Sequence, residues 1–182
     1  ANALCAVIFN FLEGLRLGTT VLVARFSASG EQAKATAAIN HGFLAVGVVG
    51  AITLFFAPLI SEKMYAVFGS VALAQYGTAY LTIWLRSIPV ILCSYVVTGL
   101  FRGLGDATTP LYATAVSCGL NIAFDYLLVF GNWGFPALGV AGAAWGTLLA
   151  NAAGLLLLGC LAWRKRLTRQ YLRLQPVSWG AL

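Results

Sequence analysis

The feature of this sequence that most restricts its fold is a series of five long apolar stretches. They cover residues 1–23, 41–60, 76–100, 110–130 and 138–163. Each reaches roughly the 20 residues that a helix needs to cross a bilayer. In lipid, backbone polar groups must be satisfied within a helix or a closed barrel, and none of the stretches alternates strictly as barrel strands do. The sequence therefore predicts an all-α, polytopic transmembrane bundle of about five spans.

Composition supports a membrane protein with no separate soluble domain. Hydrophobic residues make up 60% of the chain and charged residues only 9%, whereas soluble domains carry about 25% charged residues. The connectors are short and rich in turn residues such as those of GNWGFP. We therefore expect one bundle over residues 1–163, followed by a basic tail over 164–182. The start lacks Met and a basic leader, which predicts that it lies inside a longer reading frame.

The basic residues are divided unequally between the two sides of the predicted bundle. The first and third connectors and the tail carry eight Lys and Arg residues, whereas the opposite side carries only Lys63. Because cytoplasmic loops are enriched in Lys and Arg, this division predicts a cytoplasmic tail and a multi-pass location in the cell (plasma or inner) membrane. The tail is expected to contact anionic lipid headgroups, and no nucleic-acid partner is expected.

Asp125 is the charged residue that most needs an explanation, because the stretch around it is otherwise apolar. An ionised Asp at the centre of a membrane helix costs about 2.5 to 3.5 kcal/mol on insertion scales, so it normally faces a partner, a wet cavity or a transported ion. Asn121 lies one helical turn away on the same face. Two interpretations stay open: a structural hydrogen bond to a neighbouring helix, or uptake of a coupling cation.

Three other charged residues fall inside the predicted spans. Glu13 and Arg16 are three residues apart, a helical spacing that lets opposite charges pair and lowers the cost of placing both in the membrane. Arg86 lies early in the third stretch, where its long stem can reach the headgroups. For all three, the sequence leaves open a structural role and a role in lining a substrate cavity.

Two further patterns concern packing and helix ends. The last stretch has small residues at every fourth position, which predicts a face where another helix approaches closely; they are Gly142, Gly146, Ala150 and Gly154. Asp106 lies in the turn before the fourth stretch, where it is expected to act as a helix cap or a gating residue.

Catalytic constellations are not found in this sequence. It has no HExxH or GxSxG motif, no Gly-rich phosphate loop and a single His. The usual nucleophile–base pairs and metal sites therefore cannot be assembled, and neither enzymatic activity nor a cofactor is expected.

Several motifs resemble those of the multidrug and toxin extrusion (MATE) transporters. FRGLGDATTPLY enters the fourth stretch, NIAFDYLLVFG follows within it, and GVAGAAWGT opens the fifth, in this order and spacing. LRLGTTVLVARFSASGEQ and YLTIWLRSIPV are similar to the DNA-damage-inducible F branch of the family. The resemblance implies a twelve-helix fold of two six-helix lobes, in which the five stretches are helices two to six of the amino-terminal lobe.

The resemblance also implies a function and a site. The family exports organic cations and other amphiphiles in exchange for H⁺ or Na⁺. In some members an Asn and an Asp on helix five and a Thr on helix six form the amino-lobe cation site, and these match Asn121, Asp125 and Thr147. Asp125 and Asn121 would then be the Na⁺ ligands. The implied partners are a small organic substrate, membrane lipids and a second lobe of the same transporter.

Two alternative functions remain open at this stage. A lipid-linked oligosaccharide flippase of the same superfamily would need a more basic cavity, for which the spans offer only Arg16 and Arg86. A non-transporting membrane scaffold subunit would use Asp125 for structure alone. Dependence of efflux on an imposed ion gradient separates these alternatives from an antiporter.

Overall fold

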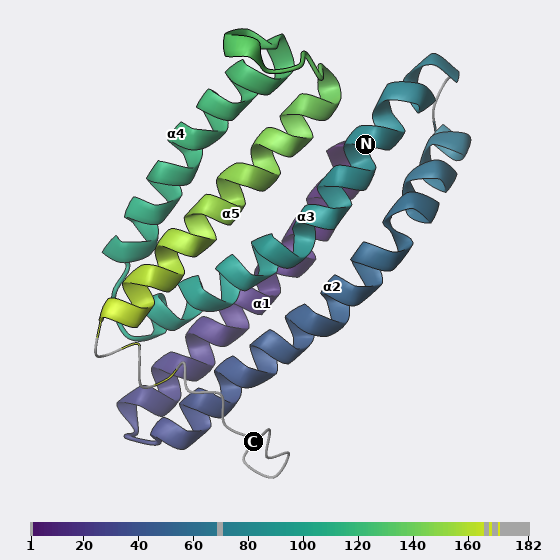
Figure 1. Cartoon of the computed structure of the whole chain (residues 1–182). Helices are drawn as coiled ribbons and strands as arrows, with labels where there is room; N and C mark the ends of the chain where they lie inside the picture. The colour runs from purple at the N-terminus through teal and green to yellow at the C-terminus, as the bar shows by residue number, and fades with distance from the viewer. Residues whose placement is uncertain (1, 69–70, 166–167, 169–170, 172–182) are drawn as a thin grey trace. The chain divides into compact units, whose positions relative to one another are not determined.

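The computed structural model of the chain is a set of long α-helices, coloured in chain order in Figure 1. It describes residues 2–68, 71–165, 168 and 171, among which no strand occurs. The elements are α1 (Asn2–Ala28), α2 (Gln32–Phe68), α3 (Val71–Gly103), α4 (Thr108–Phe130), the short 3-10 helix η1 (Asn132–Gly134) and α5 (Val140–Arg164). The prediction of an all-α fold with five long helices is confirmed.

Four of these helices contain a segment long and apolar enough to cross a membrane, namely Gln32–Lys63, Gly77–Gly103, Thr108–Phe130 and Val140–Arg164. In α4 only 6% of the apolar window is buried, so most of its side chains face outward, as they would toward lipid. The first predicted stretch coincides with α1, whose side chains before Glu13 lie outside the described part of the chain. The prediction of a multi-pass membrane protein is confirmed.

Two of the helices extend by many residues beyond the stretches that predicted them. α2 begins at Gln32 and ends at Phe68, and α3 begins at Val71, whereas the apolar stretches cover only 41–60 and 76–100. Hydropathy marks only the part of a helix that suits the hydrocarbon core, which is about 30 Å thick. A helix can continue beyond that core with polar residues, and hydropathy does not register this extension.

The chain forms two compact units, each of which is built from several helix segments. The first unit takes its described residues from 1–46, 92–113 and 155–182, and the second takes its from 47–91 and 114–154. The connections after α1 and α3 and the end of α5 thus share the first unit, with Arg25, Arg102 and Arg164. The cytoplasmic side of the tail stays a prediction, as does the domain boundary at residue 163.

In the first unit, α1 and α3 approach each other closely at two glycines of α3. A Cβ added at Gly99 would lie 2.9 Å from the Thr19 side chain, and one added at Gly103 would lie 2.7 Å from that of Val23. Glycines at a spacing of four allow membrane helices to approach to backbone contact. The segment GLFRG of α3 is therefore a helix-packing motif.

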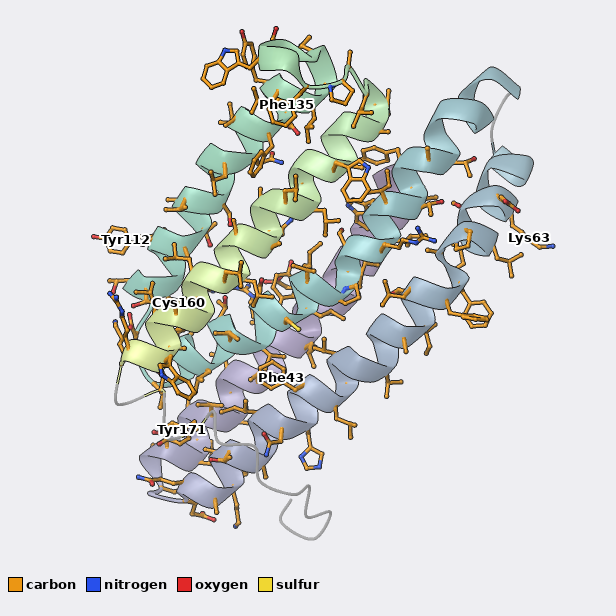
Figure 2. All side chains as sticks on the ribbon, in the orientation of Figure 1. Phe43, Lys63, Tyr112, Phe135, Cys160 and Tyr171 are labelled. Carbon is orange, nitrogen blue, oxygen red and sulfur yellow. The ribbon has the colours of Figure 1, made fainter. Side chains whose placement is uncertain are left out.

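The apolar core of the first unit surrounds Phe101, which is fully buried. Segments of α3, α4 and α5 supply it, and Phe43 of α2, labelled in Figure 2, packs against its surface. The buried members are Val97, Phe101, Ala113, Leu158 and Ala162. Interior side chains pack about as densely as molecules in organic crystals, so this core holds the ends of these helices together.

In the second unit, a close approach at a glycine and a hydrogen bond connect α2 and α3. Gly50 leaves space for the ring of Pro89, which a Cβ at position 50 would approach to 3.2 Å. The hydroxyl groups of Ser61 and Thr82 lie 2.6 Å apart in a hydrogen bond between the helices. A polar bond of this kind stabilises membrane helix pairs by roughly 0.6 kcal/mol on average.

The connection between α4 and α5 interrupts the helical structure, as the residues GNWGFP predicted. Gly131, Trp133 and Gly134 have positive φ angles of 71°, 57° and 84°. The Leu138 N–H donates to the Leu128 carbonyl at 2.9 Å, which brings the start of α5 back to the end of α4. Glycine adopts positive φ at no steric cost, so Gly131 and Gly134 accommodate this conformation without strain.

Candidate cation site

α4 and α5 lie side by side and run in opposite directions in the second unit (Figure 1). Gly142 of α5 lies so close to α4 that an added Cβ would overlap the Leu128 carbonyl group. Farther along the pair, the Ser117 hydroxyl donates to the Ala150 carbonyl at 3.0 Å. The prediction that the small residues of α5 form a close packing face is confirmed at these positions.

The carboxylate of Asp125 stands between these contacts, against Gly146 of α5. Its Oδ1 atom occupies the space that a Cβ on Gly146 would fill. This oxygen is buried and accepts no hydrogen bond from any described residue. A buried acceptor left without a partner costs about 1 to 3 kcal/mol, more when it is charged. An oxygen in this state would gain free energy from any group that donates to it or neutralises it, a proton or a cation among them.

Asn121 lies one helical turn from Asp125, Thr147 directly follows Gly146, and the side chains of Asn121 and Thr147 contact each other. The Asn121 amide nitrogen donates to the Thr147 hydroxyl at 3.4 Å, and this hydroxyl in turn donates to the Ala143 carbonyl at 2.9 Å. Because the amide uses its nitrogen in this contact, its oxygen stays available as an acceptor. Of the three residues to which the resemblance assigned the cation site, Asn121 and Thr147 are thus in contact, and Asp125 stands against Gly146, the residue before Thr147.

A carboxylate, an amide oxygen and a hydroxyl are hard oxygen ligands. Ligands of this type suit alkali and alkaline-earth cations, whereas transition metals prefer nitrogen or sulfur. Among the described residues, no three His, Cys, Asp or Glu side chains gather in a metal-binding group. With one carboxylate, the arrangement fits a single positive charge, either Na⁺ or a proton.

The other charged residues predicted within spans occupy different places. Arg16 pairs with Glu13 in the first unit, and its guanidinium carbon lies 6.0 Å from the centre of the Tyr95 ring. Arg86 is exposed in the second unit, and no described contact joins it to Asp125. Glu13 and Arg16 have the geometry of a structural ion pair, and Arg86 has the exposure expected of a residue that reaches the headgroups. Cavity lining by these three stays a prediction.

Asp106 caps α4, which confirms one of the roles expected for it. Its Oδ1 accepts the Thr109 N–H at 3.0 Å, and its Oδ2 accepts the Lys165 ammonium at 2.6 Å. Desolvation acts to raise the pKa of Asp106, but hydrogen bonds from Lys165, Thr109 and Thr108 outweigh it and hold that pKa well below its usual value. The carboxylate therefore stays ionised and ties the end of α5 to the start of α4 within the first unit.

The exposed face of α4 is apolar and aromatic. Tyr112, at 70% exposure, points away from α5 (Figure 2). Ile122 and Phe130 are exposed to a similar extent. Large apolar side chains on an outer helix face suit a lipid environment. The polar residues Asn121 and Asp125 thus lie on the side of α4 that meets α5, and the opposite side is suited to lipid.

The fold and the site together define a multi-pass α-helical membrane protein with polar, oxygen-bearing side chains between two of its helices. The sequence profile of the MatE family matches residues 1–127 of the chain. The chain therefore belongs to the MATE family, as the motifs around Asp106, Asp125 and Thr147 indicated.

Similar proteins carry names connected with drug resistance and DNA damage. The probable multidrug resistance protein NorM of Thermotoga maritima is 29% identical over the whole chain, which spans 39% of that protein. The DNA damage-inducible protein F of Escherichia coli is 34% identical over 94% of the chain, which spans 35% of it. The chain therefore corresponds to little more than a third of these relatives.

A solved structure also matches. It is described as the inward-facing conformation of a multidrug resistance MATE family transporter of the MOP superfamily. The match has a TM-score of 0.75 and 27% sequence identity, and it covers 85% of this chain and 34% of that one. The helical arrangement of the chain is thus that of part of a MATE transporter.

Proposed function

We propose that this chain forms part of a secondary active antiporter that exports organic cations or other amphiphilic compounds in exchange for H⁺ or Na⁺. The observation that carries this proposal is the buried Asp125 carboxylate oxygen without a hydrogen-bond partner, next to the contact between Asn121 and Thr147. Relatives named as multidrug resistance proteins support the class of substrate.

The coupling of cation binding to the conformational change follows from the charge of Asp125. Binding of H⁺ or Na⁺ neutralises the Asp125 carboxylate and removes the cost of holding an ionised acid inside the membrane. If the outward-open and inward-open states bind the cation with different affinity, binding shifts the equilibrium between them. A charge that crosses a potential of 100 mV contributes about 2.3 kcal/mol, which is enough to drive such a shift.

Transport needs more than the residues of this chain. By the family resemblance, its helices are helices two to six of the amino-terminal lobe, and the substrate would be held between this lobe and a second one. The chain spans 39% of the Thermotoga maritima relative, which leaves room in such a protein for further helices. Cytoplasmic placement of the basic tail belongs to the same proposal.

The positions of the arginines favour an antiporter over a flippase. A flippase for a lipid-linked oligosaccharide must hold a pyrophosphate and therefore needs free positive charge in its cavity. Arg16 is already paired with Glu13, and Arg86 is exposed. A scaffold subunit remains the other alternative, and it predicts no dependence of transport on either ion.

The test uses the full-length gene product that carries this sequence, reconstituted in vesicles with an imposed Na⁺ or pH gradient. Asp125→Asn keeps the size of the side chain and removes its charge, so ion-driven efflux of a cationic dye should fall on the order of tenfold or more. Glu62→Gln is the matched control, because Glu62 is an exposed acid of the same unit. Efflux by Asp125→Asn that keeps its full rate and ion dependence would refute the proposal.

A further inference from the structure

We propose that Gly146 is a positioning residue of the cation site: its missing side chain reserves the space on α5 in which the Asp125 carboxylate stands. This inference rests on the proposed function of Asp125. It goes beyond that function because it assigns the geometry of the site to a residue that has no ligand atom in its side chain.

The contact at Gly146 differs from the other glycine contacts of this helix pair. A Cβ at Gly146 would overlap Oδ1 of Asp125, the end of a side chain, and would lie 3.3 Å from the Asp125 backbone nitrogen. A Cβ at Gly142 would instead overlap the backbone carbonyl of Leu128. A side-chain end can rotate away from a new methyl group, but a backbone carbonyl can move only with its helix. Gly146 therefore determines the position of a functional side chain, whereas Gly142 determines how closely the two helices approach.

The position of the carboxylate affects how the site can bind a cation. With glycine at position 146, Oδ1 of Asp125 lies directly against α5, at the residue that precedes Thr147. A methyl group there would turn the carboxylate away from α5 and from the hydroxyl that lies one residue on. Oxygen ligands must converge on one point to bind a small cation. Displacement of one of them weakens binding even though the ligand itself is still present.

The expected result is a change in cation affinity that is larger than the change in folding. Gly146→Ala should raise the Na⁺ or H⁺ concentration for half-maximal efflux on the order of tenfold, as misplacement by about 1 Å costs enzymes up to 100-fold. Gly142→Ala should lower thermal stability and leave this concentration unchanged in the protein that folds. Gly119→Ala on α4 is the neutral control, because nothing lies within 4 Å of its added Cβ.

A second measurement covers the case in which Gly146→Ala folds poorly. If the new methyl competes with the carboxylate for space, removing the carboxylate must relieve the competition. Asp125→Ala combined with Gly146→Ala should therefore be at least as stable as Asp125→Ala alone. A loss of stability that persists in the double variant would overturn the inference, since the overlap would then involve a different group.

The two proposals fail in different ways. If Asp125→Asn removes ion dependence but Gly146→Ala keeps the half-maximal concentration of the wild type, Gly146 is a packing residue only and the proposed function stands. If Asp125→Asn keeps full ion dependence, both proposals are wrong. A selective rise in the half-maximal concentration for Gly146→Ala, with near-normal maximal rate and stability, supports both.

Discussion

Replacement of Asp106 tests how the first unit is held together at the ends of its helices. This residue accepts the Thr109 N–H at 3.0 Å and the Thr109 hydroxyl at 2.7 Å, at the start of α4. It also accepts the Lys165 ammonium at 2.6 Å, from a residue that directly follows α5. Asp106→Ala removes the helix cap and the ion pair together, whereas Asp106→Asn removes mainly the charge.

The expected loss of stability follows from the helix cap and from the solvent exposure of Asp106 and Lys165. Loss of an N-cap side chain costs about 1 kcal/mol, within a range of roughly 0.5 to 2. The side chains of Lys165 and Asp106 are 47% and 23% exposed, and ion pairs open to solvent contribute at most about 1 kcal/mol. We therefore expect Asp106→Ala to lower the free energy of unfolding by about 1 to 2 kcal/mol. Asp106→Asn should cost about 1 kcal/mol or less.

The assay is reversible unfolding of the full-length protein in mixed detergent micelles, with a double-mutant cycle. Lys165→Met serves as the partner variant, because it keeps an apolar side chain of similar length and removes the ammonium group, which lies 5.9 Å from the centre of the Phe101 ring. The coupling free energy between positions 106 and 165 should be up to about 1 kcal/mol. A coupling of zero would refute the ion pair, and equal costs for Asp106→Ala and Asp106→Asn would refute the cap.

The pH dependence of this contribution has a definite sign. Because the folded state holds the pKa of Asp106 below its usual value, the ionised form stabilises the fold. This stabilisation is complete above the unfolded pKa, about 3.9, and is lost as pH falls through the lower folded pKa. The stability difference between wild type and Asp106→Asn should thus stay constant from about pH 8 to pH 5 and shrink only below about pH 4. A difference that already declines near neutral pH would contradict this account.

Two further predictions concern glycines at close contacts and turns. Gly103→Ala places a Cβ 2.7 Å from Val23, so it should lower the free energy of unfolding by about 1 to 3 kcal/mol; a neutral effect would show that α1 and α3 do not depend on this approach. Gly131→Ala should cost more than Gly134→Ala, because both residues have positive φ but only the Cβ at 131 meets Ala137, at 2.8 Å. Thermal unfolding of Gly131→Ala and Gly134→Ala measures which variant loses more stability. Equal losses of stability would contradict the prediction.

The sequence alone determined the properties that depend on neighbours along the chain. Apolar length predicted the helices, because a membrane allows a backbone few other structures. The helical period placed Asn121 and Asp125 on one face, since residues four apart lie one turn apart in any helix. Turn residues predicted the break after Phe130, and an acid before Thr109 predicted the cap. Each of these relations is local, so no knowledge of the fold was needed.

Only the tertiary structure decided which residues meet across helices. The contact of Asp125 with Gly146, and that of Gly103 with Val23, depend on the rotation and depth at which two helices pack. The GLFRG segment of α3 was not singled out from the sequence, although its two glycines at a spacing of four were a visible signal. In a chain with 20 glycines, spacing alone cannot show which ones face a helix. Packing of many side chains at once sets that rotation, and no single pattern along the chain records it.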